Sequence, residues 1–469
     1  MELFTHEVHK KLIDRLQKEI KTTSFNGRVF LVGGCIRDSL LKLPIKDIDI
    51  AVECEGGGIG LAALLAAKDK SYKFGKNPVM YPKYGTARVV LRNDKELSDI
   101  TLEIAQTKKN SIDKELGSIT EDAFIRDLTI NSLYYSVTNN NLYDPTSYGI
   151  DDMVNRTLRC PASILGDEEI DKIYQESPIK MLRTIRFSAI LGWGIEKNTW
   201  LGIIRNSKFI TKASQELITE EISKILTSQN ASACIRKMLY CGILNKVMPD
   251  IYDLTTVYES KNPALTSFDH TMMVLDKVQP QLEVRLAALF HDVGKIANII
   301  GYGVSQDSFS ADIASCDLKT MKFSNAVISS VENSIKYHRF FRNYADGIVP
   351  PDKKIRKFIN ECGDNIGNVA DLMNANNLYQ TYDKKKRQVL DILNRIEELD
   401  ELEESKNVKL PINGNDIMKY LKLKKGSPIV GKVMEHLKNA YFENPKITKE
   451  ECFKLIDSLR LVMVGILKT

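Results

Sequence analysis

The chain has 469 residues, of which 43% are hydrophobic and 27% charged, and its formal net charge is +5. This length favours about three domains, and the composition is typical of a soluble globular protein. No apolar run approaches the roughly 18 residues of a membrane-spanning helix, and the N-terminus has no signal-peptide pattern. The eight cysteines follow no disulfide or metal-binding spacing. We therefore expect a cytoplasmic protein with no membrane partner, and the sign of its charge suits an RNA partner.

The first informative segment is a glycine pair between an apolar run and a predicted helix. Gly33 and Gly34 follow the run at residues 29–32, and the helix that begins after them carries Arg37 in its first turn. Glycines at a helix start let a phosphate group approach the backbone amides, where the helix dipole favours negative charge. The pattern therefore predicts a phosphate-binding turn with an arginine beside it.

The next apolar run carries two carboxylates. Asp47 and Asp49 point to one face of the predicted strand because side chains alternate, and such pairs hold divalent cations together with substrate phosphates. A third carboxylate, Glu103, lies in the alternating segment 101–105 and joins the pair if its strand is a neighbour. Residues 79–91, between them, predict a strand, a turn and a second strand.

These segments resemble the polymerase β-like nucleotidyltransferases, specifically the bacterial tRNA CCA-adding enzymes and poly(A) polymerases. Residues 125–133 are similar to the second signature of that family, residues 144–152 to its flexible segment between head and neck, and residues 176–187 to its nucleotide-selecting motif. The resemblance implies a nucleotide-binding set that consists of Gly33, Gly34, Arg37, Arg126, Asp127, Asn131, Glu176, Lys180, Arg183 and Arg186.

The resemblance also implies a reaction. Asp47, Asp49 and Glu103 would be the catalytic residues and the ligands of two Mg²⁺ ions, and the 3′-hydroxyl of an RNA would attack the α-phosphate of a nucleoside triphosphate. The implied partners are ATP and CTP, or other NTPs, and the 3′ end of tRNA or another RNA. The implied activity is template-independent nucleotide addition, with tRNA CCA addition or repair the leading form.

The chain departs from the family pattern where the base is chosen. Ser177 replaces an aspartate and Lys180 an arginine, and lysine cannot reproduce the planar two-pronged fork of arginine. Ile125 and Leu217 also replace arginines. The order of C and then A therefore does not carry over, and a poly(A) or other nucleotide transferase with altered base selection stays open.

A second group of residues lies in the C-terminal half. His270, the pair His291 and Asp292, and His338 resemble the signature of HD-domain phosphohydrolases, whose imidazole and carboxylate ligands hold a second divalent cation. The distant aspartate of that family is Asn376 here, which weakens the expected site. Two alternatives follow: a metal-dependent phosphohydrolase whose head only binds nucleotide, and an RNA-binding protein without catalysis.

Together these patterns predict an α/β head with a mixed sheet, followed by a long all-α neck, an HD-type body and a tail. The expected boundaries are 1–160 for the head, 161–230 for the neck, 231–400 for the body and 401–469 for the RNA-binding tail. Helices are predicted at 179–191, 220–226 and 234–247. Lysine-rich stretches at 383–388 and 422–425, the second beside a predicted helix start at 426–428, are candidate RNA contacts. The sequence leaves the oligomeric state open.

Overall fold

The computed structural model describes residues 4, 7–45, 47–67, 78–91, 100–111, 115–260, 262–297, 305–341, 344, 348–376, 382–401, 410–423 and 428–466, without the side chains of 84, 91, 382–387, 400–401 and 460–466. The chain divides into two compact units, Met1–Pro249 and Asp250–Thr469. The lysine side chains predicted as RNA contacts at 384–386 and 424–425 lie outside this description. No described helix has the length and apolar character needed to cross a bilayer.

A seven-stranded mixed sheet forms the centre of the head, in the order β3-β4-β5-β2-β1-β6-β7. Only the β2–β5 pair is parallel among the neighbours in this sheet. The predicted strand, turn and strand at 79–91 are confirmed as β3, a 3-10 turn and β4. The strands are β1 (Val29–Val32), β2 (Asp47–Val52), β3 (Val79–Tyr81), β4 (Thr86–Leu91), β5 (Ile100–Gln106), β6 (Tyr134–Ser136) and β7 (Leu142–Tyr143).

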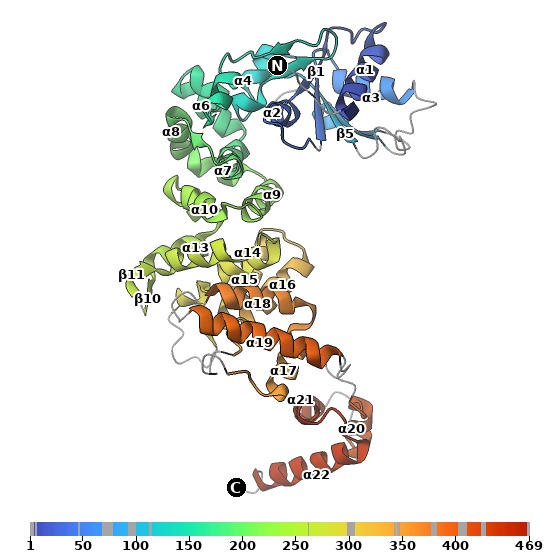
Figure 1. Cartoon of the computed structure of the whole chain (residues 1–469), viewed down its shortest axis with the longest axis vertical. Coiled ribbons are helices and arrows are strands. Elements are labelled where there is room, and N and C mark those ends of the chain that lie inside the picture. Colours follow the sequence, from blue (N-terminus) through green and yellow to red (C-terminus); the bar gives the residue numbers. More distant parts are fainter. Residues whose placement is uncertain are drawn as a thin grey trace. The chain divides into compact units, whose positions relative to one another are not determined.

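Helices α1 (Glu7–Ile20), α2 (Gly34–Leu40) and α3 (Gly57–Ala67) lie beside this sheet, in blue in Figure 1. Their apolar side chains join those of the strands in one core, because β1 and β2 alternate toward it and α1 presents a single apolar face. The short helix α4 (Ile119–Phe124) is fixed by a capping box at Ser118. Figure 1 therefore confirms the predicted α/β head.

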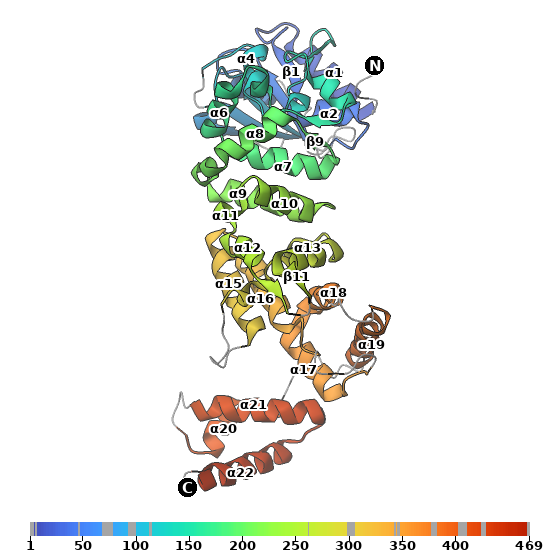
Figure 2. The same ribbon diagram turned by 90° about the vertical axis from the view of Figure 1, so that its left-hand side faces the viewer.

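Helices follow the head almost without interruption, as predicted. In unit 1 they are α5 (Gly149–Val154), α6 (Asp167–Glu176), α7 (Ile179–Leu191), α8 (Lys197–Asn206), α9 (Gln215–Leu226), α10 (Ala231–Tyr240) and α11 (Leu244–Val247), with a small β8–β9 pair (Thr157–Leu158 and Gly194–Ile195). Figure 2 shows α9 and α10 packed below α7. The helix expected over 234–247 is divided, because Gly242 has a φ of 79° and ends the helical path.

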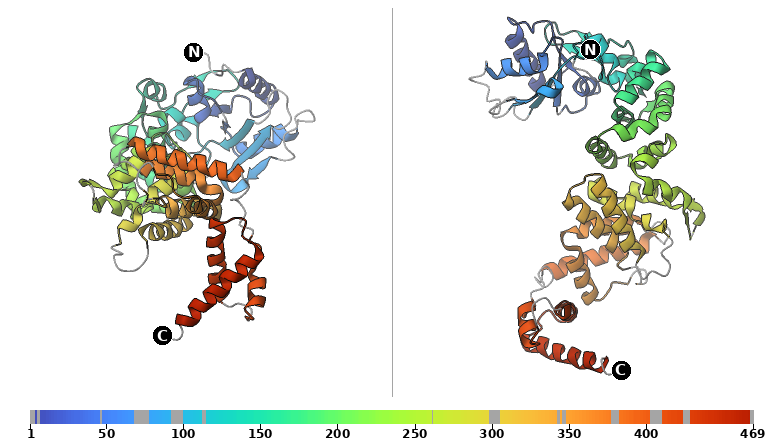
Figure 3. Two further views of the ribbon diagram at one scale, coloured as in Figure 1. Left: turned by 60° about the horizontal axis from the view of Figure 1, so that its bottom comes forward. Right: turned by 180° about the vertical axis from the view of Figure 1, so that it is seen from behind.

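The described residues of unit 2 form helices and turns, together with a hairpin of β10 (Tyr258–Glu259) and β11 (Asn262–Thr266). Its helices are α12 (Pro249–Asp253), which begins at the unit boundary, α13 (Ser267–Lys277), α14 (Leu282–Phe290), α15 (Gln306–Thr320), α16 (Asn325–Tyr337), α17 (Asp352–Cys362), α18 (Ile366–Asn376), α19 (Tyr382–Glu401), α20 (Gly414–Tyr420), α21 (Pro428–Glu443) and α22 (Lys449–Ile466). The last three, red in Figure 3, pack around an apolar core of their own. The predicted four-part boundaries stay a prediction.

Candidate nucleotidyltransferase site

The three predicted catalytic carboxylates lie on two neighbouring strands. The parallel register of β2 and β5 pairs Asp49 with Glu103 and Asp47 with Thr101. Ile48 and Ile50 are buried on the opposite face, so the two aspartates share the face that points away from the core. Glu103 was expected to join the aspartate pair only if its strand lay beside theirs, and β5 does lie beside β2.

These carboxylates do not form a closed ligand shell by themselves. Among the described residues, the only group of three or more ligand-type side chains gathered within 4.8 Å is His270, His291 and Asp292 in unit 2. The head carboxylates are more widely spread, as expected for Mg²⁺, which usually takes one or two carboxylates and completes its shell with water and substrate phosphates. The donor set thus suits a cation that arrives with a triphosphate.

Gly33 lies directly against the Asp49 carboxylate. Its φ is +77°, and a Cβ at this position would lie 2.8 Å from Asp49 Oδ2 and 3.8 Å from Arg126 Nη1. Any larger residue would therefore meet the carboxylate and strain the backbone. Glycine thus lets the backbone of this turn lie directly against an acid and a base, Asp49 and Arg126.

Burial governs the charge of Asp49. It raises the pKa of the Asp49 carboxyl to about 6, with smaller raising contributions from Glu103 and Asp47, while Arg126 and Arg183 act in the opposite direction. Like charges side by side resist full ionisation, and a bound cation removes that penalty. The electrostatics of this face therefore favour a divalent cation.

Arg126 is held by two residues that the sequence analysis did not single out. Its Nε donates to Asp122 Oδ2 at 3.0 Å and to Tyr134 Oη at 2.9 Å, and its guanidinium lies over the Tyr134 ring. Tyr134 Oη in turn donates to Asp122 Oδ2 at 2.5 Å. Because Asp122 stands four residues before Arg126, i,i+4 pairing was the available sequence signal.

The Asp127 carboxylate accepts three hydrogen bonds from neighbouring residues. Its Oδ2 accepts from Arg183 Nε at 2.7 Å, and its Oδ1 accepts from Asn131 Nδ2 at 3.1 Å and from the Leu128 amide at 2.9 Å. Burial raises the pKa of Asp127, but Arg183 and Asn131 outweigh it and hold the pKa well below its usual range. The carboxylate therefore remains ionised and keeps one acceptor site among the described contacts.

Two of the four predicted phosphate-binding arginines are buried. Arg37 and Arg186 are each 8% exposed, and their guanidinium carbons lie 4.9 and 4.2 Å from the centre of the Phe187 ring. Arg37 donates to Asp38 and, at 2.8 Å, to Asn131 Oδ1, while Arg186 Nε donates to Glu221 Oε2 at 2.6 Å. These contacts join the head to α7. The side chains of Arg126 and Arg183 are more exposed than those of Arg37 and Arg186.

The residues at the base-selecting motif lie at the α6–α7 junction. Lys180 Nζ donates to the Ile125 carbonyl at 2.5 Å and to Ser111 Oγ at 3.0 Å, so two of the departures from the family pattern touch each other. Burial lowers the pKa of Lys180 to about 8 despite nearby Cys160, Asp127 and Glu176. The lysine therefore remains mostly charged at neutral pH.

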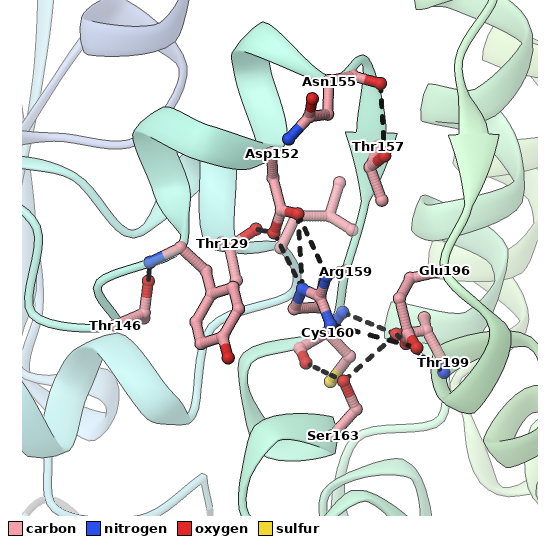
Figure 4. Close-up of polar contacts among 12 residues, drawn as sticks. Thr129, Thr146, Asp152, Asn155, Thr157, Arg159, Cys160, Ser163, Glu196 and Thr199 are labelled. Atoms are coloured by element: carbon pink, nitrogen blue, oxygen red, sulfur yellow. Dashed lines mark hydrogen bonds and ion pairs between the residues drawn. The ribbon is translucent and has the colours of Figure 1, made fainter.

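A buried polar network fixes the joint between the head and the first neck helices (Figure 4). Arg159 pairs with Asp152 at 3.0 Å, and Asp152 Oδ2 also accepts from Thr129 Oγ1 at 2.7 Å. On the other side the Cys160 amide donates to Thr199 Oγ1 at 3.0 Å. No pattern in the sequence indicated this network, because its hydrogen bonds join residues that are 7 to 39 positions apart.

In unit 2, the predicted HD residues gather in one place. His270 Nε2 lies 3.4 Å from His291 Nε2 and 2.9 Å from Asn376 Oδ1. Asp292 Oδ2 lies 3.6 Å from His270 Nε2 and 3.1 Å from His291 Nε2. Four ligands at about 2.1 Å from a metal are themselves separated by about 3.4 Å. The histidines and Asp292 thus fit one metal ion, and Asn376 occupies the position expected for the distant aspartate.

Other contacts at this cluster both favour and oppose a metal. The His338 ring lies edge-on to His291, and its buried Nε2 has no hydrogen-bond partner among the described residues. Asp292, however, also accepts from Lys295 at 2.7 Å and from Arg339 at 2.9 Å. These two cations offset the carboxylate charge and would also attract an anionic group.

Two family models match the chain. Residues 29–159 match the poly A polymerase head domain, and residues 192–254 match the probable RNA- and SrmB-binding site of polymerase A. A multifunctional CCA protein of Psychromonas ingrahamii is 29% identical over 289 residues, which cover 57% of this chain and 63% of that protein. Over its head and the helices that follow, the chain is thus similar to CCA-adding enzymes and poly(A) polymerases. It spans less than two thirds of the length of this curated relative.

Solved structures of CCA-adding enzymes share the fold. The Bacillus stearothermophilus enzyme in complex with CTP has a TM-score of 0.67 at 18% identity, covering 98% of this chain and 100% of that one. The Thermotoga maritima enzyme complexed with tRNA has a TM-score of 0.57 at 17% identity, with the same coverage. At these identities the likeness concerns the fold alone.

Proposed function

We propose that the protein is a template-independent nucleotidyltransferase that adds nucleotides from NTPs to the 3′ end of an RNA, with tRNA CCA addition or repair as its foremost activity. The observation that carries the proposal is the β2–β5 register, which sets Glu103 beside Asp49 on the face that also bears Asp47. The tRNA, ATP and CTP partners rest on the names of its relatives.

Each group at the site has a part in this reaction. Asp47, Asp49 and Glu103 would hold Mg²⁺, which when bound activates the RNA 3′-hydroxyl and stabilises the departing pyrophosphate. Arg126 and Arg183 neutralise triphosphate charge next to Asp49, and Gly33 lets the phosphates approach. The remaining acceptor site of Asp127 holds a ribose hydroxyl.

The resemblance places Arg37 and Arg186 among the residues that bind the nucleotide. In our proposal they mainly position other parts of the site. Both are buried, and their guanidinium groups are engaged by Asp38, Asn131 and Glu221. We propose that they set the angle of α7 against the head and so place Arg183 near Asp49 and Asp127.

The decisive experiment removes the aspartate pair. We expect Asp47→Ala combined with Asp49→Ala to abolish incorporation of labelled NTPs into tRNA truncated at its 3′ end, because the remaining carboxylate cannot hold two cations. The thermal unfolding of the variant should match that of the natural chain, since β2 keeps its buried side chains. Asp14→Ala, which removes an exposed carboxylate of α1, serves as the control. Undiminished incorporation by the folded double variant would refute the proposal.

A second activity, metal-dependent phosphohydrolysis in unit 2, is favoured by the ligand-like distances among His270, His291 and Asp292. Its test uses the Asp47→Ala, Asp49→Ala variant supplied with Mn²⁺, Co²⁺, Ni²⁺ or Zn²⁺, ions that suit imidazole ligands. We expect release of phosphate from RNA ends that carry a 3′-phosphate or opening of a 2′,3′-cyclic phosphate, and loss of both when His291→Ala is added. A chain that binds no metal and releases no phosphate would leave the cluster structural.

A further inference from the structure

An exposed arginine continues the row of carboxylates across the head sheet. Arg88 on β4 pairs in register with Glu103 on β5, which itself pairs with Asp49 on β2. Residues directly opposite each other on neighbouring strands point to the same face of a sheet. Ala87 and Val89, on either side of Arg88, are buried in the core of the head. The Arg88 side chain therefore points to the face that bears the catalytic carboxylates.

The Arg88 guanidinium group is available to a ligand. The residue is exposed, and no hydrogen bond or ion pair engages its side chain within the described part of the chain. An exposed arginine opposite a glutamate usually forms a cross-strand pair, but Arg88 and Glu103 are not joined in this way. The Cα atoms of Arg88 and Asp49 are two strand spacings apart, roughly 10 Å. One extended ligand can therefore contact both side chains.

Beyond Arg88, the same face of the sheet ends in an exposed aromatic side chain. On β3, the next strand, Val79 pairs with Arg88, and Tyr81 follows two residues later, so both point to the face of Arg88. Val79 is 52% exposed and Tyr81 44% exposed. Proteins bind single-stranded nucleic acid with cations along its phosphates and aromatic rings under its bases. Arg88 and Tyr81 are such a combination, and we call them the acceptor surface.

The groups that suit a triphosphate lie on the other side of Asp49. Gly33 follows β1, the other neighbour of β2, and its backbone lies against Asp49 and Arg126. In an in-line displacement the attacking and leaving oxygens are on opposite sides of the reacting phosphorus. A pyrophosphate that leaves on the β1 side of Asp49 therefore requires an attacking hydroxyl on the β5 side, toward Glu103 and Arg88.

Given the proposed nucleotide transfer, we propose that the acceptor surface holds the 3′ end of the RNA substrate. Arg88 binds the phosphodiester that precedes the terminal nucleotide, and Tyr81 stacks on a base farther from the end. Together they keep the 3′-hydroxyl beside Glu103 while the nucleotide binds on the β1 side of Asp49. Neither contact reads a base edge, so the surface accepts a single-stranded end of any sequence.

The first test varies each substrate of the full chain in turn, with Mg²⁺, CTP and tRNA that lacks its 3′ CCA. We expect Arg88→Gln to raise the KM for tRNA about tenfold, because a charged hydrogen bond to a phosphate is lost, and to leave the KM for CTP within twofold. Arg28→Gln serves as the matched control, because it changes an exposed arginine at the end of β1 opposite to Gly33. It should leave both KM values unchanged.

The aromatic half of the surface has its own pair of variants. Tyr81→Ala should raise the KM for tRNA about fivefold or more, because the stacked base loses its platform. Tyr81→Phe keeps the ring and should retain the wild-type KM for tRNA. A merely structural role of Tyr81 would change the thermal unfolding of the Ala variant but would not single out the tRNA substrate.

Equilibrium binding separates the acceptor surface from the transfer reaction. The affinity of the Asp47→Ala, Asp49→Ala variant for the same tRNA is measured at several salt concentrations, with and without Arg88→Gln. We expect Arg88→Gln to weaken binding about tenfold and to reduce the slope of log affinity against log salt by about 0.7, the contribution of one phosphate of a single strand. Arg88→Lys keeps the charge and should keep the slope.

The outcomes distinguish the two proposals. If the wild-type chain transfers no nucleotide but its binding of tRNA still depends on Arg88 and Tyr81, the proposed function fails and the acceptor surface stands. An unchanged KM for tRNA and an unchanged salt slope in folded Arg88→Gln would overturn the acceptor surface, as would a rise in the KM for CTP alone. Should Arg88→Gln fail to fold, equal KM values for tRNA in Tyr81→Ala and Tyr81→Phe would overturn it.

Discussion

At the scale of single residues, the position of the Asp49 carboxylate depends on one glycine. Gly33 combines a left-handed backbone with a direction in which any side chain would collide with the Asp49 carboxylate. Gly27 has nearly the same φ, +78°, but nothing lies within 4 Å of its position for a Cβ. Substituting each glycine in turn therefore separates the effect of backbone strain, which both positions share, from the effect of displacing the Asp49 carboxylate, which only Gly33 has.

We expect Gly33→Ala to lower the rate of NTP incorporation by about 100-fold, because displacing a metal-binding carboxylate by a fraction of an ångström misaligns the reacting groups. Gly27→Ala should leave that rate within twofold, although both variants lose about 1–2 kcal/mol from backbone strain. Steady-state incorporation and urea denaturation of both variants provide the measurements. Equal loss of activity in the two would assign the effect to strain alone.

At the scale of elements, α7 connects the head to the helices that follow it. Arg183 reaches Asp127 in the head, whereas Arg186, one turn along, pairs with Glu221 on α9. The Arg186–Glu221 pair is buried, with side-chain exposures of 10% and 5%. Breaking a buried pair leaves an uncompensated charge, which makes this contact far more sensitive than an exposed pair.

Arg186→Met should lower the free energy of unfolding by about 3 kcal/mol, because buried Glu221 then loses its hydrogen-bonded partner. It keeps only the longer contacts with Arg183 at 4.0 Å and Lys224 at 3.8 Å. Arg205→Met, which breaks the more exposed pair with Asp171 on neighbouring helices, should cost about 1 kcal/mol or less. Urea denaturation of the two full-length variants compares them. Similar losses in both would show that the Arg186 pair is no more than a surface contact.

At the scale of the whole molecule, each unit carries its own chemistry on its own framework. In unit 1 the mixed sheet sets Glu103 beside Asp49, and α7 brings Arg183 to Asp127. In unit 2 the helices α13, α14, α16 and α18 each contribute to the histidine cluster, at the helix end or just after it for His291 and His338. The two proposed activities therefore use different cations and can be removed one at a time.

Much of the fold followed from local patterns. The α/β head, the strand pair at 79–91 and the helix at 179–191 were predicted because alternation and helical spacing are properties of neighbouring residues. The helix at 234–247 was predicted as one element and is two, because a single glycine in a left-handed conformation is invisible to apolar spacing. The candidate site residues were identified from sequence motifs. Asp122 and Tyr134, which bind Arg126, and Glu221, which binds Arg186, belong to no such motif and were not identified.

The sequence alone indicated the chemistry that we propose for the chain, because the glycine pair, the aspartate pair and the histidines are recognised by residue type and spacing. Only the tertiary structure decided how those groups are used. It showed that Arg37 and Arg186 are buried and that Lys180 donates to Ile125 and Ser111. It also showed that Glu176 Oε2 has no hydrogen-bond partner among the described residues. The physical reason is that hydrogen bonding and burial arise from residues tens of positions apart, which no local pattern records.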